Sequence, residues 1–74
     1  MSECFLVCYK DEKSNYECEY FGPGRREDAI KYYKTKLALI SQNLNDWEKE
    51  TGVYKCVWRK NEQRRELYLK IIEV

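Results

Sequence analysis

Six apolar residues in the middle of the chain recur at spacings of three and four, the period of one face of an α-helix. They are Ile30, Tyr33, Leu37, Ile40, Leu44 and Trp47. Glu27 and Asp28 stand where the first turn of such a helix favours negative charge, and Gly52 suits the position just after its end. The pattern predicts one long helix over residues 26–50, with a buried stripe along one side.

A helix of that length would be longer than the strands beside it. Residues 26–50 would extend about 37 Å at 1.5 Å per residue, whereas strands of six to eight residues span about 20–27 Å. Asn43 and Asn45 are weak helix formers, and Asn45 with Glu48 has the spacing of a new capping pair. A continuous helix and a helix that kinks or breaks at residues 43–45 are therefore both open.

The residues before the helix predict a β-hairpin. Residues 4–9 form a continuous apolar run, which is typical of a strand covered on both faces. After a polar turn at residues 11–15, residues 16–21 alternate between tyrosine or cysteine on one side and glutamate on the other. The sequence Gly-Pro-Gly at residues 22–24 ends this hairpin.

The residues after the helix predict a second hairpin, with strands at residues 53–59 and 65–73. A two-residue turn at Asn61-Glu62 would bring apolar residues of both strands to one face, which would be the floor for the helix. These residues are Tyr54, Cys56, Trp58, Leu67, Leu69 and Ile71. The opposite face would carry Val53, Lys55, Val57, Arg59, Glu66, Tyr68, Lys70 and Ile72.

Together these elements predict a single α+β domain over residues 1–74. It has two layers in the order β-β-α-β-β, with a four-stranded antiparallel sheet and one long helix packed on one face. Because the first strand is apolar on both sides, we expect it inside the sheet, in the strand order 2-1-3-4. The order 2-1-4-3 is the alternative.

The residues that most enzymes use are missing from this chain. There is no histidine, the commonest general acid, base and metal ligand. The three serines have no partner base, and Gly-Pro-Gly lacks the spacing of a phosphate-binding loop. Glu17 and Glu19 are interpreted as the solvated side of a strand rather than as a catalytic pair. We expect a protein that is not an enzyme and needs no cofactor.

The four cysteines do not have the spacing of a metal site. Cys4 and Cys8 would lie about 13 Å apart along an extended strand, too far to share a metal or a disulfide. If Leu6 pairs with Tyr20, Cys8 lies opposite Cys18, close enough for incidental oxidation. We interpret the cysteines as small buried apolar residues.

The chain lacks an apolar run of about 20 residues that would span a membrane, and its first residues do not resemble a signal peptide. We therefore expect a cytoplasmic protein with reduced cysteines and no membrane partner.

The basic residues of the second hairpin suggest a nucleic-acid site. Net charge is only +1, but residues 1–24 carry −3 and residues 53–74 carry +3. The candidate phosphate contacts are Arg59, Lys60, Arg64 and Arg65 at the hairpin tip, joined by Arg25 and Arg26. Nearby aromatic residues would stack on bases. The alternative is a solvated turn whose charges prevent aggregation, and the near-neutral net charge favours it.

One face of a four-stranded sheet with a single helix has no cover from its own chain. We expect this face to carry the partner interface, formed by Phe5, Val7, Tyr9, Val57, Tyr68 and Ile72. Tyr32 and Leu39, off the helix stripe, form a second candidate surface. An uncovered apolar surface on a small protein is typical of association. The alternative is that tyrosines and lysine stems cover it.

Our leading hypothesis is a small binding or regulatory protein that acts by protein–protein interaction and forms a homodimer through this face. The alternatives are a nucleic-acid-binding protein and a structural subunit of a larger assembly. In size and lack of catalytic residues the chain resembles accessory proteins of phages and mobile elements, which bind and block a host protein.

Overall fold

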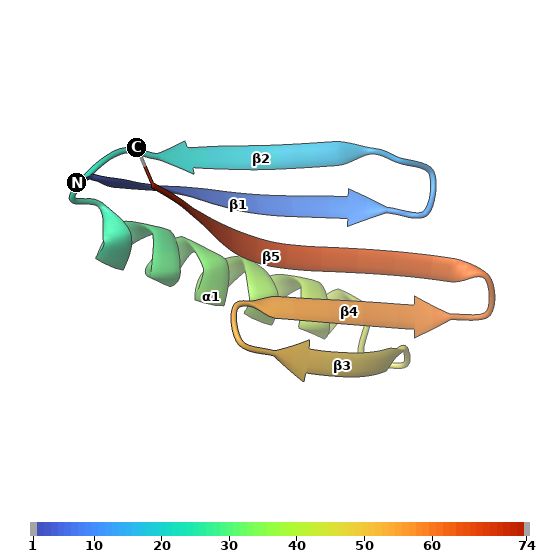
Figure 1. Ribbon diagram of the computed structural model, residues 1–74. Helices are drawn as coiled ribbons and strands as arrows, with labels where there is room; N and C mark the ends of the chain where they lie inside the picture. The colour runs from blue at the N-terminus through green and yellow to red at the C-terminus, as the bar shows by residue number, and fades with distance from the viewer. Residues whose placement is uncertain (1, 74) are drawn as a thin grey trace.

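The computed structural model describes residues 2–73, which form one helix and five strands in two layers (Figure 1). The elements in chain order are β1 (Glu3–Asp11), β2 (Tyr16–Phe21), α1 (Arg26–Asn43), β3 (Glu48–Gly52), β4 (Lys55–Lys60) and β5 (Gln63–Glu73). All strands belong to one antiparallel sheet, and α1 lies across one of its faces. The predicted α+β class is confirmed, with one strand more than the four predicted.

The strand order is β2-β1-β5-β4-β3. The favoured order 2-1-3-4 was therefore wrong, and the alternative, in which the last strand lies beside β1, is the one observed. β5 is the longest strand, with 11 residues, and pairs with the whole of β1 from Glu3 to Asp11. The two longest strands thus pair with each other inside the sheet, while the shorter β4 lies further out.

The helix ends at Asn43 instead of continuing to residue 50. The Leu44 amide still donates to the Ile40 carbonyl at 2.9 Å, and the Trp47 amide then donates to the Leu44 carbonyl at 3.1 Å in a turn. The break expected as one option at residues 43–45 is confirmed. After this turn the chain enters β3, and residues 2–73 contain no second helical segment.

The extra strand, β3, has the sequence Glu-Lys-Glu-Thr-Gly and no apolar side chain to bury. As a helix it would have no face to pack against the sheet. As a strand its backbone pairs with the outer edge of β4, where Lys49 lies opposite Trp58 and Thr51 opposite Cys56. A charged strand at the sheet edge also discourages pairing with other chains.

The register predicted for the second hairpin is confirmed, and the first hairpin has the register considered as a condition above. Leu6 pairs with Tyr20 in the first hairpin, and Trp58 pairs with Arg65 in the second. The second hairpin turns at Asn61-Glu62, where Asn61 adopts a φ of 55°. Asparagine tolerates this left-handed conformation better than most residues, which explains why a tight turn forms here.

The core lies between α1 and the sheet and draws mostly on the strands. Its buried residues are Phe5, Val7, Phe21, Ala29, Tyr33, Cys56, Trp58, Leu67 and Leu69. The helix contributes only Ala29 and Tyr33, and the rest of the predicted stripe packs half-buried along its margin. Ala29, which is fully buried, was missed because its small side chain marks close approach of the helix and carries little apolar signal.

Tyr32 and Leu39, which lie outside the predicted stripe of α1, differ in their burial. Tyr32 packs its ring 5.5 Å from that of Phe21 and extends the core. Leu39 is 57% exposed on the outer surface of α1. They do not form a joint surface.

Replacing Leu67, which is fully buried, with alanine should lower the free energy of unfolding by about 2–5 kcal/mol. The reason is the cavity left beneath the helix. Leu39→Ala removes the same atoms from an exposed site and should change stability by less than about 0.5 kcal/mol. Urea titration of both variants measures this difference, and equal losses would contradict the described core.

Tyr33 should make stability depend on pH in alkaline solution. Its hydroxyl is buried without a hydrogen-bond partner among residues 2–73, and burial raises the pKa of Tyr33 to about 12. The unfolded chain deprotonates tyrosine near pH 10, so between about pH 10 and 12 it holds fewer protons than the native state. The free energy of unfolding should therefore fall in this range, by roughly 2 kcal/mol from Tyr33.

Tyr33→Phe serves as the control, because it removes the titrating group and an unsatisfied hydroxyl together. At neutral pH this variant should be as stable as the natural chain to within about 1 kcal/mol. Above pH 10 its stability should fall less steeply. Identical slopes in alkaline urea titrations would show that Tyr33 is not the titrating group.

Candidate functional site

The side chains of β1 face the opposite sides of the sheet from those predicted. Residues directly opposite each other in a sheet share a face, and Phe5 lies opposite Ile71 while Val7 lies opposite Leu69. Phe5 and Val7 are each 2% exposed in the core under α1, and Tyr9 packs against the same core. The prediction that these three residues line the uncovered face was therefore wrong. A strand that is apolar on both sides carries no sign of which side faces the helix.

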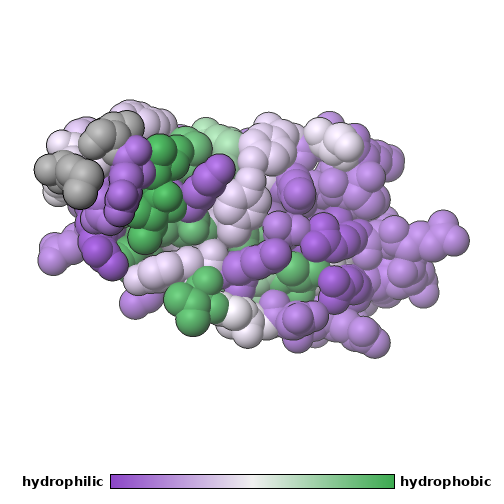
Figure 2. Space-filling model, in the orientation of Figure 1, coloured by the Kyte–Doolittle hydropathy of each residue, from purple (hydrophilic) through white to green (hydrophobic). Residues whose placement is uncertain are grey.

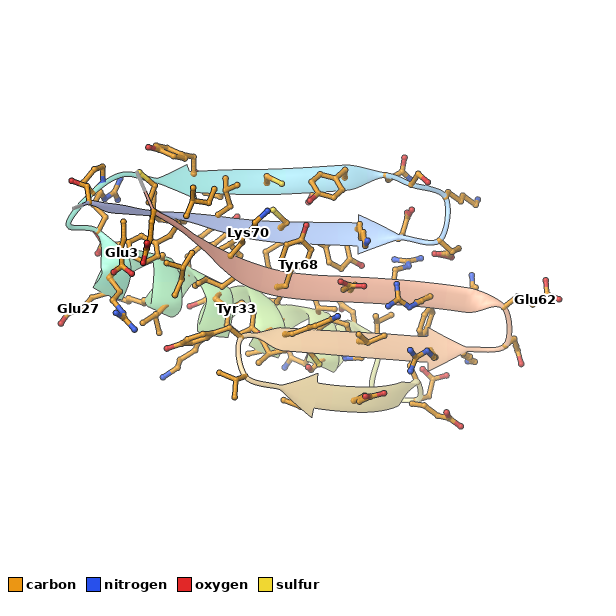
Figure 3. All side chains as sticks on the ribbon, viewed as in Figure 1. Glu3, Glu27, Tyr33, Glu62, Tyr68 and Lys70 are labelled. Carbon is orange, nitrogen blue, oxygen red and sulfur yellow. The ribbon has the colours of Figure 1, made fainter. Side chains whose placement is uncertain are left out.

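The sheet face turned away from α1, here called the open face, has no covering segment among residues 2–73 (Figure 1). As predicted, Val57, Tyr68 and Ile72 belong to it. By register the strands β2, β1 and β5 contribute Cys4, Leu6, Cys8, Lys10, Tyr16, Cys18, Tyr20, Arg64, Glu66, Tyr68, Lys70 and Ile72. From β4 come Lys55, Val57 and Arg59. Figure 3 shows Tyr68 and Lys70 on this face and Tyr33 on the helix behind it.

Two tyrosines form an arch across β1. The hydroxyls of Tyr16 on β2 and Tyr68 on β5 meet in a short hydrogen bond above the strand between them. Cys8 lies opposite both Cys18 and Tyr68 and is only 1% exposed, although it belongs to the open face. The hydrogen bond to Tyr68 raises the pKa of Tyr16. The arch therefore covers part of the face with flat rings.

The third tyrosine makes a similar contact at the other end of the first hairpin. The Tyr20 hydroxyl donates to the Cys4 sulfur at 3.1 Å, and this bond raises the pKa of Tyr20. Tyr16 and Tyr20 are still 56% and 59% exposed. Tyrosine rings with exposed surface and a fixed hydroxyl are well suited to contact a partner at low entropic cost.

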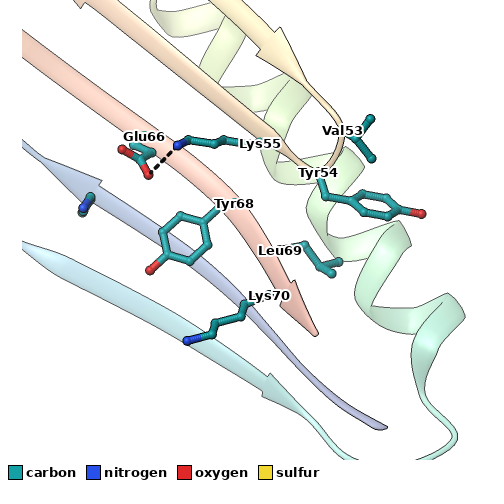
Figure 4. Close-up of a pocket in the computed structure, with 8 residues that line it drawn as sticks. Val53, Tyr54, Lys55, Glu66, Tyr68, Leu69 and Lys70 are labelled. Carbon is teal, nitrogen blue, oxygen red and sulfur yellow. Dashed lines mark ion pairs between the residues drawn. The ribbon is translucent and has the colours of Figure 1, made fainter. Parts of the chain in front are cut away.

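The centre of the open face is basic. Lys55 and Lys70 flank Tyr68 and a shallow hollow of about 410 Å³, which Lys10 also lines (Figure 4). The one carboxylate there, Glu66, is 7% exposed and binds Arg64 at 2.8 Å and Lys55 at 3.8 Å. Within residues 2–73, Lys10 and Lys70 have no carboxylate partner within 4.0 Å.

The acidic residues of the first hairpin lie on the other side of the sheet. Glu17 is opposite Tyr9 and accepts a hydrogen bond from Lys36 of α1 at 3.4 Å. Glu19 is opposite Val7 and shares that side. The charge of β2 is thus directed away from the open face, so a chain with a net charge of +1 still presents cations at the centre of this face.

The open face is also apolar toward one end. Figure 2 shows green side chains gathered near the ends of the chain, and purple ones toward the hairpin turns. Cys4, Leu6 and Ile72 belong to this end by register. The surface therefore combines an apolar end, a tyrosine arch and a basic centre.

The six basic residues expected to form one phosphate site do not come together. Arg25 and Arg26 lie at the start of α1, at the opposite end of the molecule from the β4–β5 turn (Figure 1). Each of the six contacts a carboxylate: Arg25 binds Asp28, Arg26 binds Glu3, Arg59 binds Glu50, Lys60 binds Asp46, Arg64 binds Glu66 and Arg65 binds Glu12.

Within the hairpin tip the two neighbouring arginines also point to opposite sides, as successive strand residues must. Arg64 reaches Glu66 on the open face. Arg65 donates to the Tyr9 hydroxyl at 3.1 Å and lies 5.4 Å from the Trp47 ring on the helix side. The predicted tip cluster is therefore divided between the two faces. The sequence placed Lys55 and Lys70 on this face without identifying them as binding residues, and it missed Lys10. Each lysine is isolated in the sequence, and only the alternation of three strands brings them together.

The cysteines are all free, and Cys18 alone is exposed. Residues 2–73 contain no group of three or more cysteine or acidic side chains arranged to hold a metal ion. In the same part of the chain, α1 is not apolar enough over its length to cross a membrane.

Comparison of this chain with family models, with curated proteins and with solved structures gave no match.

Tyr68→Ala should uncover the Cys8 thiol by removing half of the arch. We expect iodoacetamide to alkylate Cys8 several-fold faster in this variant than in the natural chain. Tyr20→Ala is the matched control, and should instead accelerate alkylation of Cys4. Fragment mass spectra distinguish the two thiols, and a Cys8 that stays equally unreactive in Tyr68→Ala would contradict the arch.

Proposed function

We propose that this chain is a small non-enzymatic binding protein that docks another protein on its open face. The observation that carries the proposal is the combination of Lys10, Lys55 and Lys70 around Tyr68 on a sheet face with no cover from residues 2–73. Tyrosines at a protein surface supply large contact areas and a polar tip, and both favour interfaces.

The charge of the face favours an acidic partner. Lys10 and Lys70 lack carboxylate partners within residues 2–73, so a partner carboxylate would gain a charge-assisted contact with each. Two copies meeting face to face would instead bring like charges together. We therefore favour an acidic heterologous protein over the homodimer. Occluding the functional surface of a host protein, as accessory proteins of phages do, is one use of such a face.

Charge reversal tests this proposal. Proteins retained by the immobilised full chain from an extract of its own cells are compared with those retained by the double variant Lys10→Glu/Lys70→Glu. The matched control is Lys31→Glu/Lys34→Glu, which makes the same charge change on exposed positions of α1. We expect a partner retained by the natural chain and the control, with affinity at least about tenfold weaker for the open-face variant.

A partner whose measured affinity is equal for both double variants would overturn the proposal, because its contacts would lie elsewhere. Sedimentation equilibrium at micromolar concentration tests whether a second copy of the chain occupies the open face. A stable dimer abolished by Lys10→Glu/Lys70→Glu would assign the face to a second copy instead.

A second candidate function is binding of single-stranded nucleic acid. The observation in its favour is the Tyr68 ring, which lies broadside on the open face between Lys55 and Lys70 (Figure 4). Bases stack on such rings while lysines contact phosphates. This candidate places the contacts on the sheet and not at the hairpin tip.

Fluorescence anisotropy with labelled single-stranded RNA and DNA at low salt tests this candidate. Tyr68→Ala and Lys70→Ala should weaken binding, whereas Lys60→Ala and Arg65→Ala should leave it unchanged, because both residues are ion-paired outside the open face. Affinity should also fall with added salt. Absence of any anisotropy change at low salt would exclude this function.

A further inference from the structure

Cys8 and Cys18 occupy a position in the sheet that suits a disulfide. They are direct partners in the β1–β2 register. The Asp11 amide donates to the Asn15 carbonyl at 3.2 Å, so this pair of residues is hydrogen-bonded. Hydrogen-bonded and non-hydrogen-bonded pairs alternate in antiparallel strands. Counting along the register, Cys8 and Cys18 form a non-hydrogen-bonded pair.

This kind of pair holds the two side chains close. Its Cα atoms are about 4.5 Å apart, within the range of roughly 4.4–6.8 Å that a disulfide requires. Both side chains point to the open face, since Cys8 shares that face with Tyr68. A Cα separation in this range allows two cysteines to be bridged within the existing strand pairing.

The other cysteines are placed so that they do not compete. Cys4 lies four residues from Cys8 on the same strand, about 13 Å away. Cys56 is fully buried in the core on the helix side. Among residues 2–73, Cys8 and Cys18 are therefore the one pair that can close.

We propose that Cys8 and Cys18 are a modification site, at which a low-molecular-weight disulfide such as glutathione disulfide oxidises them to a reversible cross-strand disulfide. The accessible Cys18 thiolate attacks one sulfur of the reagent, forms a mixed disulfide and releases one reagent thiolate. The Cys8 thiolate then attacks the Cys18 sulfur and displaces the second. Two cysteine thiols lose two protons and two electrons, and one reagent disulfide becomes two thiols.

The accessibility of the two thiols fits this order. Cys18 is exposed and can meet a reagent, whereas Cys8 is 1% exposed beneath the tyrosine arch and needs to reach only its neighbour. Desolvation and the contact with Cys8 raise the pKa of Cys18. The first step should therefore speed up as pH rises, because the thiolate is the attacking species.

The disulfide would fasten an edge strand that buries little of its own surface. β2 is an edge strand in which Tyr16 through Tyr20 are all exposed, and only Phe21 is buried. A covalent link at its centre would fix the strand that carries Tyr16 and Tyr20. From the loop that it closes, we expect the equilibrium constant for unfolding to fall about a hundredfold.

The test treats the purified full chain with glutathione disulfide and maps tryptic peptides without reduction. Lysines between the two cysteines place them in separate peptides, which only a disulfide holds together. We expect a chain lighter by two hydrogen atoms, and a linked peptide pair that disappears in Cys8→Ser and in Cys18→Ser. Cys4→Ser and Cys56→Ser should keep the link, and Cys4→Ser also assigns it to Cys8.

Two results would overturn the proposal. One is a chain that stops at the mixed disulfide on Cys18 with no linked peptide. The other is a link that persists in Cys8→Ser. Hydrogen exchange gives an independent readout on the natural chain, since oxidation should slow exchange in residues 16–21 and reduction should restore it. Unchanged hydrogen exchange in a fully linked chain would contradict the proposal that the disulfide stabilises β2.

Discussion

The pairing of β1 with β5 is the interaction on which the rest of this structure depends. It joins the two ends of the sequence along the whole of β1, from Glu3 opposite Glu73 to Asp11 opposite Arg65. Its register places Phe5 and Val7 beneath the helix and sends Cys8 to the other side. A shift by one residue would exchange the two faces of β1. The core, the tyrosine arch and the position of the cysteine pair all follow from this one alignment.

The core that results is thin, and the tyrosines help to make up for it. A chain of 74 residues buries a smaller fraction of its surface than a larger domain does. Here α1 supplies only two fully buried side chains, and the sheet supplies the others. On the open face Cys8 and Val57 are nevertheless buried, because neighbouring side chains cover them. The open face is therefore partly covered by its own side chains, which the Tyr16–Tyr68 contact orders, and is not a bare apolar sheet.

Charge is distributed between the two faces in a way that the net charge hides. The glutamates of β2 point to the helix side, where Glu17 meets Lys36. The lysines of β1 and β5 point to the open face, where Glu66 is already engaged by Arg64 and Lys55. A partner that approaches this face meets cations and tyrosine rings together. This combination supports binding more directly than the ion-paired arginines of the hairpin tip do.

The sequence alone determined the local elements. The helix period and the polar turns located both hairpins, and the Asn61-Glu62 turn gave the register of the second, because these features depend on residues close in the chain. It also marked residues 43–45 as the weak point of the helix. It did not predict β3, because a strand without apolar residues exists only where a neighbouring edge accepts its backbone.

The tertiary structure decided which strands are neighbours and which side of each strand packs against the helix. Three features depend on the β1–β5 register, which joins residues about 60 positions apart. They are the strand order, the inward side of Phe5, Val7 and Tyr9, and the gathering of Lys10, Lys55 and Lys70. A strand that is apolar on both sides is compatible with either orientation, so its alternation contains no information about the choice. The choice was made by packing, because only one orientation lets β1, β5 and α1 bury Phe5, Val7, Leu67 and Leu69 together.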